Sequence, residues 1–234
     1  MNLARIHNRL RRRLPRFGSF RSPEPVNPDF GWAAGTPVDR YYLDQFLAAH
    51  ADAIAGRVLE IGGRDYTLRF GAHEVSTSIV LTHAADEQLR DDPDVIRGDL
   101  TACPDLADGS VDCVLLPHVL QYLPDVGAAL RELARILAPG GTALIAVPCI
   151  SQISRWDDDR FGDRWRFTSR GLRELLTAAF PPPTGSVEVT AYGNAFSALC
   201  GLEGIPLEQI DARELKPRVA DYEVLVCAAV RKSA

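Results

Sequence analysis

The fold is decided by residues 111–148, which read VDCVLLPHVLQYLPDVGAALRELARILAPGGTALIAVP. Residues 111–116 form a short apolar run, which is typical of a strand buried on both faces of a sheet. Asp125 is a suitable N-cap for a following helix, whose apolar residues recur at helical spacing along one side. A Pro-Gly-Gly sequence at 139–141 then stops the helix and turns the chain into the apolar residues 142–147. A strand-helix-strand unit of this length predicts two parallel strands joined by a right-handed crossover.

This stretch resembles the core of the class I S-adenosylmethionine-dependent methyltransferases. In that superfamily a Phe-Asp-hydrophobic strand leads to a Leu-Pro-Asp helix start and then to Arg-hydrophobic-Leu-x-Pro-Gly-Gly. The counterparts here are Val111-Asp112, Leu123-Pro124-Asp125 and residues 135–141. The resemblance implies an α/β fold with a Rossmann-like seven-stranded sheet, mostly parallel with an antiparallel last strand, and with helices on both faces.

The remaining chain fits this architecture. Its 234 residues, 46% hydrophobic and 24% charged, suit one soluble α/β domain. We expect residues 1–36 to be a basic N-terminal segment and linker or wrapping loop, and residues 37–234 to be one class I methyltransferase domain. Asp39 and Thr168 are expected to cap helices. Strands are expected near 57–61, 77–82, 94–97, 111–116, 142–147, 186–192 and 222–230.

The charge of the N-terminal segment is unlike that of the rest. Residues 1–23 hold seven arginines and no acidic residue, although the chain carries a net charge of −5. Leu3, Ile6, Leu10 and Leu14 lie along one side of a possible short helix that Pro15 ends. Residues 1–21 suit either a membrane surface or an acidic partner, or contact the chain's own acidic domain. Nucleic-acid binding is not expected, because the main domain is acidic and lacks an aromatic-basic platform.

Composition also indicates the cellular compartment in which the protein is expected. No apolar run approaches the ~20 residues of a transmembrane helix, and no apolar signal core is present near the N-terminus. Five widely spaced cysteines without a Cys-x-x-Cys motif favour free, buried thiols. We therefore expect a cytoplasmic protein without a transmembrane segment.

Two further motifs resemble the cofactor site of the superfamily. Residues 58–63, VLEIGG, resemble its Val-Leu-Glu-hydrophobic-Gly-x-Gly motif, which implies that Glu60 and the backbone of Gly62 and Gly63 face the methionine end of S-adenosylmethionine. The sequence Gly-Asp-Leu at 98–100 resembles the segment that meets adenine, which implies that Asp99 accepts from the adenine amine while Leu100 packs on the ring. A nicotinamide cofactor is not expected, because G-x-G-x-x-G is absent.

The ribose contact is not assigned. The superfamily's second strand commonly ends in an acidic residue, whereas this strand runs into Thr82 and His83, with Asp86 and Glu87 later. His83 is either a polar contact for the cofactor or a surface residue. The glycine motif also departs from the pattern, since Arg64 stands where further glycines are common.

His118 is the candidate catalytic residue. It follows the predicted fourth strand at its carboxyl end, where ligands of parallel sheets bind. A histidine there can act as a general base toward a hydroxyl acceptor. The alternative is a structural role, in which His118 caps the next helix or packs beside Tyr122.

Residues 154–168 are the candidate acceptor site. Trp156 and Trp165 can stack on a sugar or aromatic ring, while Arg164 or Arg166 can bind a carboxylate or phosphate. The alternative is a folded cap whose charges pair locally. The segment resembles a methyltransferase subgroup associated with glycan-modifying systems. No metal is expected, because the adjacent aspartates at 157–159 point in different directions and no histidine is nearby.

These observations predict an S-adenosylmethionine-dependent methyltransferase that acts on a polar small molecule. O-methylation is favoured, with a sugar or a natural-product intermediate as candidates. The alternatives are a catalytically silent binding or partner module and a cofactor-binding enzyme with non-methylating chemistry. The acceptor, its reacting atom and the oligomeric state are left open.

Overall fold

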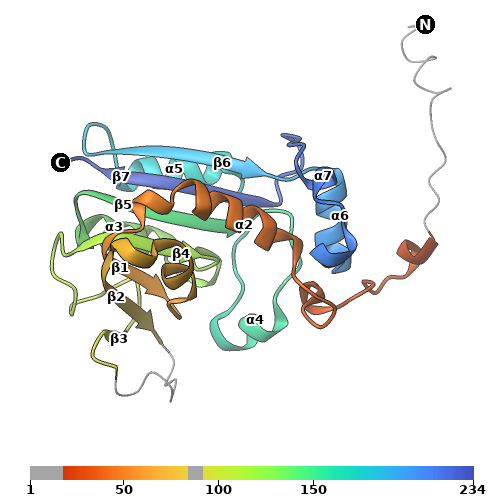
Figure 1. The fold of residues 1–234 in the computed structure, drawn as a ribbon, viewed down its shortest axis with the longest axis horizontal. Helices are drawn as coiled ribbons and strands as arrows, with labels where there is room; N and C mark the ends of the chain where they lie inside the picture. The colour runs from red at the N-terminus through yellow and green to blue at the C-terminus, as the bar shows by residue number, and fades with distance from the viewer. Residues whose placement is uncertain (1–17, 84–91) are drawn as a thin grey trace, which may run out of the picture.

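The computed structural model describes residues 18–83 and 92–234. Seven described strands form one sheet in the order β3-β2-β1-β4-β5-β7-β6 (Figure 1). They are β1 (Gly56–Ile61), β2 (Val75–Thr82), β3 (Val95–Arg97), β4 (Val111–Pro117), β5 (Leu137–Pro148), β6 (Gly185–Tyr192) and β7 (Leu225–Lys232). Pairing is parallel from β3 through β5, whereas β7 is antiparallel to both β5 and β6. The expected sheet with a reversed last strand is confirmed.

Helices cover both faces of this sheet (Figure 1). The described helices are α2 (Val38–Ala49), α3 (Val126–Ile136), α4 (Arg155–Phe161), α5 (Ser169–Ala179), α6 (Ala195–Glu203) and α7 (Ala212–Leu215). On one face, Val114 of β4 packs with buried leucines of α3 and α5. On the other, Cys113 and Leu115 pack with α2 and α6. Because successive strand residues point to opposite faces, the apolar residues 113–116 of β4 serve both cores.

The α3 segment follows the sequence closely. The Asp125 carboxylate accepts a hydrogen bond from the amide of Ala128 at 2.8 Å, and the apolar side of the helix is buried. The Pro-Gly-Gly sequence acts differently from expectation. Leu137 already pairs with Val111, and the pairing resumes only at Thr142, so residues 138–141 form an irregularity at the start of β5.

Other connections differ from the expected pattern in detail. Between β1 and β2 the chain forms only a π-helical turn, Thr67–Gly71, and a 3-10 turn, Ala72–Glu74. The last strand begins at Leu225 instead of residue 222. The five cysteines are free; four are buried and Cys149 is half-buried.

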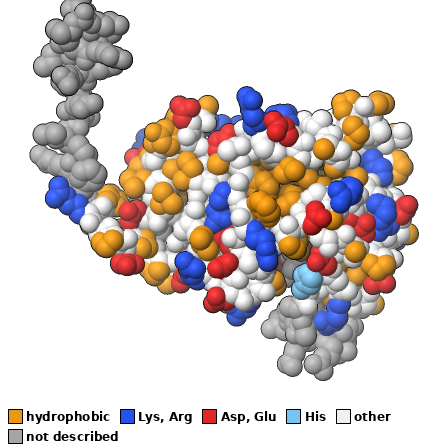
Figure 2. All heavy atoms as spheres, turned by 180° about the vertical axis from the view of Figure 1, so that it is seen from behind, with side chains coloured by type: hydrophobic (Ala, Val, Ile, Leu, Met, Phe, Trp, Pro, Cys, Tyr) orange, Lys and Arg blue, Asp and Glu red, His pale blue; other side chains and the backbone are white. Residues whose placement is uncertain are grey.

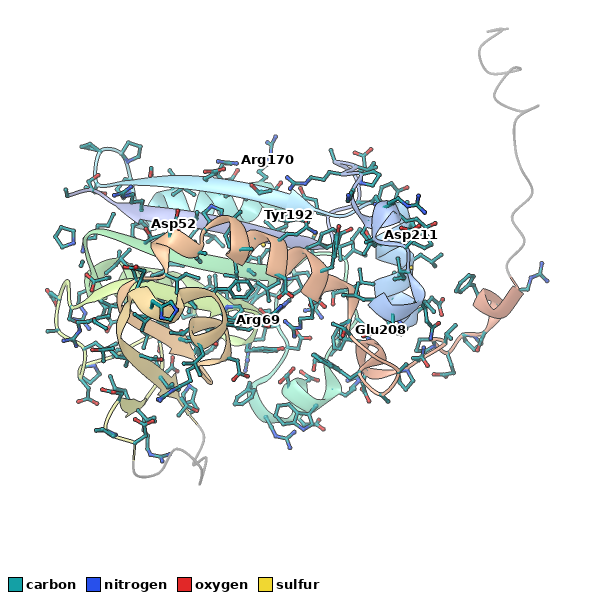
Figure 3. All side chains as sticks on the ribbon, in the orientation of Figure 1. Asp52, Arg69, Arg170, Tyr192, Glu208 and Asp211 are labelled. Atoms are coloured by element: carbon teal, nitrogen blue, oxygen red, sulfur yellow. The ribbon has the colours of Figure 1, made fainter. Side chains whose placement is uncertain are left out.

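The segment before α2 packs against the end of α6 and the chain that follows it. The amide of Asn27 donates to the Glu203 carbonyl at 2.9 Å. Gly31 lies so close to Gly204 that a Cβ at Gly31 would approach the Gly204 oxygen to 2.2 Å. The amide and hydroxyl of Thr36 donate to the carboxylate of Glu208, which is labelled in Figure 3. Residues 27–36 thus form the wrapping loop considered from the sequence.

The surface opposite the view of Figure 1 mixes charges of both signs with a central apolar area (Figure 2). Across the two described ranges, no helix is long and apolar enough to cross a membrane. Residues 1–17, which make up most of the predicted basic segment at 1–21, lie outside the described residues, so a membrane-surface or acidic-partner contact there stays a prediction.

Candidate active site

A cavity of about 530 Å³ lies at the carboxyl ends of β1, β2, β3 and β4. This is where an open parallel sheet binds its ligands, and the volume is typical of a small-molecule site. Of the residues expected to contact a cofactor, Gly62, Asp99 and Leu100 line this cavity, whereas Glu60 and Gly63 do not. The full lining is Ile61, Gly62, Leu81, Thr82, His83, Gly98, Asp99, Leu100, Pro117, His118, Val119, Tyr122, Leu123, Pro124, Arg160, Phe161 and Arg164.

Gly62 presents its backbone to this cavity. Its φ of +82° lies in the region that favours glycine, and a Cβ there would meet no atom within 4 Å. The Gly62 amide donates to the Leu81 carbonyl at 2.9 Å, which ties the turn after β1 to β2. The backbone is therefore fixed and directly accessible from the cavity.

Glu60 braces that turn. Its carboxylate is 3% exposed and accepts from the amides of Tyr66 and Thr67, at 3.2 and 2.7 Å, and from the Thr67 hydroxyl at 2.7 Å. Burial raises the pKa of Glu60, although the Thr67 bonds act in the opposite direction. The side chain thus organises the chain after the glycines without lining the cavity.

Asp99 presents its carboxylate at the opposite wall. Its Oδ1 accepts from the amide of Thr101 at 2.7 Å, and its Oδ2 lies 3.5 Å from Nε2 of His83. Leu100 beside it is 2% exposed. Asp86 and Glu87, which come after the second strand, lie outside the described residues, and the ribose contact stays unassigned.

A second cavity of about 230 Å³ adjoins the first, and His118 and Tyr122 line both. It is enclosed by the wrapping loop, the start of α2, the turn after β4 and the chain from 148 to 166. The lining residues are Asp29, Phe30, Trp32, Pro37, Asp39, Arg40, His118, Gln121, Tyr122, Pro148, Ser151, Gln152, Ser154, Trp156, Asp157, Asp163 and Arg166.

His118 stands at the junction of the two cavities. Its φ of +55° is uncommon for a residue other than glycine, and its amide donates to the Ala146 carbonyl at 2.8 Å. Nε2 lies 3.0 Å from Oδ2 of Asp39, and the side chain is 14% exposed. Burial, together with the charge of Arg40, lowers the pKa of His118 against the opposing effect of Asp39. The imidazole is therefore neutral near pH 7 and able to accept a proton.

Comparison with known proteins relates the core of the sheet to one kind of domain. A sequence model described as a methyltransferase domain matches residues 57–145, which span β1 to β5. Residues 57–145 therefore match a methyltransferase domain, and the fold of the chain is that of S-adenosylmethionine-dependent methyltransferases. The volume of the first cavity and the open backbone at Gly62 fit S-adenosylmethionine, the expected cofactor.

Solved structures share the fold at low sequence identity. A methyltransferase from Thermotoga maritima, described as a possible histamine N-methyltransferase, is 19% identical, with a TM-score of 0.55 over 84% of this chain and 92% of its own. The N-methyltransferase NodS of Bradyrhizobium japonicum, solved with S-adenosylhomocysteine, is 15% identical, with a TM-score of 0.53 over 88% of this chain and 93% of its own.

One curated relative matches a short stretch. An uncharacterized 37.1 kDa protein in transposon TN4556 of Streptomyces fradiae is 42% identical over 55 residues. The match covers 24% of this chain but only 16% of that relative.

Asp39 and Arg40 of the methyltransferase were not predicted as site residues. Pro37 stands at the N-cap position of α2, so the expectation that Asp39 caps this helix is wrong; Asp39 faces His118 from the first turn instead. Burial acts to raise the pKa of Asp39, yet Arg40 and His118 hold it well below its usual range. Burial likewise opposes the charge of Arg40, but Asp39 holds the pKa of Arg40 above its usual value.

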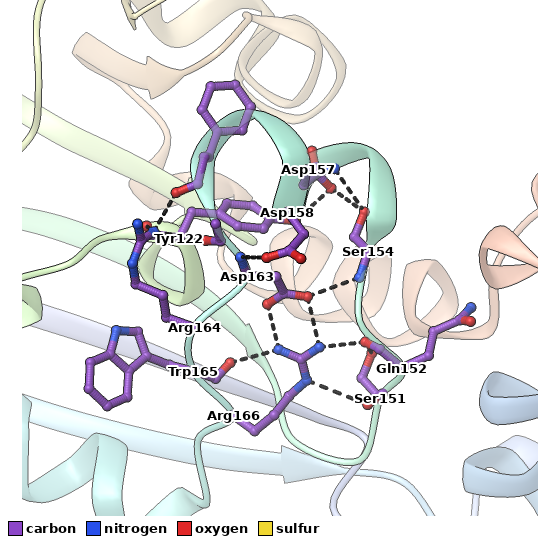
Figure 4. A network of polar contacts seen from close by, with 12 residues as sticks. Tyr122, Ser151, Gln152, Ser154, Asp157, Asp158, Asp163, Arg164, Trp165 and Arg166 are labelled. Carbon is purple, nitrogen blue, oxygen red and sulfur yellow. Dashed lines mark hydrogen bonds and ion pairs between the residues drawn. The ribbon is translucent and has the colours of Figure 1, made fainter.

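A polar network holds the loop around α4 of the methyltransferase (Figure 4). The Tyr122 hydroxyl donates to Oδ2 of Asp157 at 2.8 Å, and the Ser154 hydroxyl donates to the same oxygen at 2.6 Å. Ser154 is also the N-cap of α4. These bonds attach the loop to the wall shared by the two cavities.

Arg166 lines the second cavity, but its donors are directed at the protein. Nη1 and Nη2 donate to the two oxygens of Asp163 at 2.6 and 2.8 Å, while other N–H groups meet the carbonyls of Ser151, Gln152 and Trp165 (Figure 4). Arg164 similarly donates to backbone carbonyls, including that of Tyr122. Local charge pairing, the alternative given by the sequence, describes Arg166, whereas Arg164 meets backbone carbonyls.

The two tryptophans differ in position. Trp156 lines the second cavity, is 61% exposed, and has the guanidinium of Arg160 3.7 Å from its ring centroid. Trp165 lines neither cavity, and its indole N–H donates to the Leu123 carbonyl at 2.8 Å. Of the three residues expected to bind acceptor, the structure places Trp156 and Arg166 at the second cavity and Trp165 outside it.

The pH dependence of the methyltransferase tests the state of His118. The lowered pKa, caused first by burial, places the loss of neutral imidazole below the ordinary value of 6.5. If His118 is the base, kcat/KM should be level near neutral pH and fall about tenfold per unit once the pH is below that pKa. Initial rates from pH 4.5 to 8.5 measure this. An acid limb centred above 6.5 would contradict the assignment.

Proposed function

We propose that this methyltransferase methylates a hydroxyl group of a polar small molecule, with a sugar or a natural-product intermediate as candidates. The observation that carries the proposal is the sharing of His118 and Tyr122 by two adjoining cavities. The larger cavity would hold the cofactor and the smaller one the acceptor. Their common wall is then the place where methyl donor and acceptor meet.

The residues of the larger cavity support a division of roles. We assign Asp99 to a polar contact with the cofactor, Leu100 to packing against its ring, and the Gly62 backbone to close approach. Glu60, which does not line the cavity, would act by positioning the turn that contains Gly62 and Gly63. When bound, S-adenosylmethionine supplies an electrophilic methyl group on a sulfonium.

His118 would supply the base. A hydroxyl is a weak nucleophile, so removal of its proton as the new O–C bond forms lowers the barrier. A neutral imidazole at the wall of both cavities can take that proton and become imidazolium. Holding the acceptor in line with the methyl group contributes further rate enhancement without any additional chemistry.

Cofactor binding separates this proposal from a silent module. Asp99→Ala is expected to weaken binding of S-adenosylhomocysteine about tenfold, because the variant loses a hydrogen-bond acceptor at the cavity wall. Isothermal titration measures this, with Asp105→Ala as the matched control, since Asp105 is exposed and lies outside both cavities.

The outcomes are distinct. No binding of S-adenosylhomocysteine by folded wild-type protein would support the silent module. Binding that Asp99→Ala leaves unchanged would remove Asp99 from the cofactor contacts. Turnover that releases S-adenosylhomocysteine together with a methylated acceptor would distinguish methyl transfer from a non-methylating use of the cofactor.

A further inference from the structure

We infer that the acceptor is an uncharged, hydroxyl-rich ring, and that Gln121, Gln152 and Arg40 are the residues that select it. This inference rests on the proposed role of the 230 Å³ cavity as the acceptor site. It concerns the chemical class of the acceptor, which the cavity walls specify in three ways: unpartnered polar atoms, charge and aromatic surface.

The walls hold buried polar atoms without partners in the described part of the chain. They are Nε of Arg40, Oε1 of Gln121 and Nε2 of Gln152. Gln121 is only 3% exposed. Buried polar groups in folded proteins are nearly always hydrogen-bonded, to protein, water or a ligand, so three such atoms around one cavity make it a polar site that a ligand can complete.

The unpartnered atoms require a ligand that both donates and accepts. The Arg40 and Gln152 nitrogens are donors, whereas Oε1 of Gln121 is an acceptor. Nε2 of His118 lies 3.0 Å from Oδ2 of Asp39 and is not counted among them. Hydroxyl groups donate and accept at the same atom, so several hydroxyls on one small ring match this set.

Charge argues against an anionic acceptor. Among the lining cations, Arg166 forms a two-pronged bond with Asp163, and Arg40 is balanced by Asp39. Asp157 and Asp29 also line the cavity, so its fixed charge is negative overall. The negative charge would repel a phosphate or carboxylate ligand. Both lining arginines are already paired with an aspartate of the protein.

A cationic amine fits the chemistry less well than a hydroxyl. A protonated amine has no lone pair for the methyl group, and it cannot accept from the Arg40 and Gln152 donors. The aromatic side chains of Phe30, Trp32, Tyr122 and Trp156 line the same cavity. They offer apolar surface to the C–H faces of a ring whose edges carry hydroxyls.

The test is an acceptor panel sorted by charge. Wild-type protein with S-adenosylmethionine is assayed for S-adenosylhomocysteine release and for methylated product. The neutral members are a methyl hexoside, a 6-deoxyhexose and an inositol; the anionic members are a uronic acid and a hexose phosphate; the cationic member is a hexosamine. We expect turnover with neutral members and at least tenfold lower kcat/KM with the charged ones.

Two variants test the selecting residues. Gln121→Leu and Gln152→Leu should each raise the acceptor KM about tenfold, because each removes a hydrogen bond and leaves the ligand group buried without a partner. The affinity for S-adenosylhomocysteine should stay within twofold. Gln209→Leu is the matched control, since Gln209 is exposed and lies outside both cavities. Gln152 is half-buried, so its variant also keeps the test open if Gln121→Leu fails to fold.

Each result decides something. Turnover confined to the anionic or cationic members would overturn the acceptor class and leave methyl transfer standing. Binding of S-adenosylhomocysteine without turnover of any panel member would overturn it as well. An unchanged acceptor KM in both variants would remove the glutamines from the site. Absence of S-adenosylhomocysteine binding would remove the proposed function and this inference together.

Discussion

Replacing His118 with asparagine is expected to lower kcat for methyl transfer by about 100- to 10,000-fold, the range that a positioned general base contributes. The variant removes the group that accepts the hydroxyl proton at the junction of the two cavities. S-adenosylhomocysteine affinity should change much less, because Asp99, Leu100 and the Gly62 backbone remain in the larger cavity.

Asparagine is the appropriate replacement because of the backbone. His118 has a φ of +55°, and asparagine tolerates this region better than other side chains with a Cβ. Circular dichroism and thermal unfolding should therefore show a folded variant. His73→Asn is the matched control, since His73 is exposed and lines neither cavity. A loss of kcat smaller than fivefold in His118→Asn would contradict the assignment of His118 as the base.

The fold could be predicted from the sequence because its signals are local. Asp125 caps α3 through an amide three residues away, and the apolar spacing of α3 fixes the side that packs on the sheet. The Pro-Gly-Gly sequence was harder to interpret. Proline and glycine end a helix and also permit an irregular strand pairing, and only the pairing of Leu137 with Val111 shows which effect applies.

The first cavity was partly predictable for the same reason. Gly62 directly follows β1, and Asp99 and Leu100 lie in the turn after β3, so the carboxyl edge of the sheet brings them together. Glu60 also belongs to a strand, but its carboxylate is directed at Thr67, whose position depends on the path of the following turn. No periodicity in the sequence encodes that path.

The second cavity was much less predictable, because its walls come from distant segments. Asp39 in α2 meets His118 after β4, and the sequence around Asp39 reads equally well as a helix cap. The pairing of Arg166 could be predicted locally, as in the alternative of a cap whose charges pair within the segment. Asp163 stands three residues before Arg166, a spacing that permits the observed ion pair. The unpartnered oxygen of Gln121 has no counterpart in any pattern, because burial and partner geometry exist only in the folded chain.

The pair formed by Asp39 and Arg40 gives the largest expected effect on stability. Asp39→Asn should lower the free energy of unfolding by about 2 kcal/mol, because it leaves the Arg40 charge without its carboxylate. The side chains of Arg40 and Asp39 are 25% and 23% exposed, which places the effect below that of a fully buried pair. Urea unfolding at pH 7 measures it.

A double-mutant cycle measures the interaction free energy between Asp39 and Arg40 apart from the effect of each single change. Arg40→Met combined with Asp39→Asn should cost less than the sum of the two single changes, by at least about 1 kcal/mol, because no charge is then left unpaired. The sign of the pH dependence follows from the pKa of Asp39, which Arg40 holds below its ordinary 3.8 despite burial. The stabilisation is thus present above pH 3.8 and is lost as the pH falls toward the lowered pKa. Additive changes would show that the two residues do not act as a pair.

The same variants also show whether Asp39 acts on His118 beyond supporting the fold. Burial and Arg40 lower the pKa of His118, and Asp39 raises it. Asp39→Asn should therefore move the acid limb of the kcat/KM profile to lower pH, and Arg40→Met should move it to higher pH. If the pair were purely structural, each variant would change the unfolding free energy but keep the acid limb of its kcat/KM profile at the wild-type pH. Opposite displacements would identify Asp39 as the residue that positions and tunes the base.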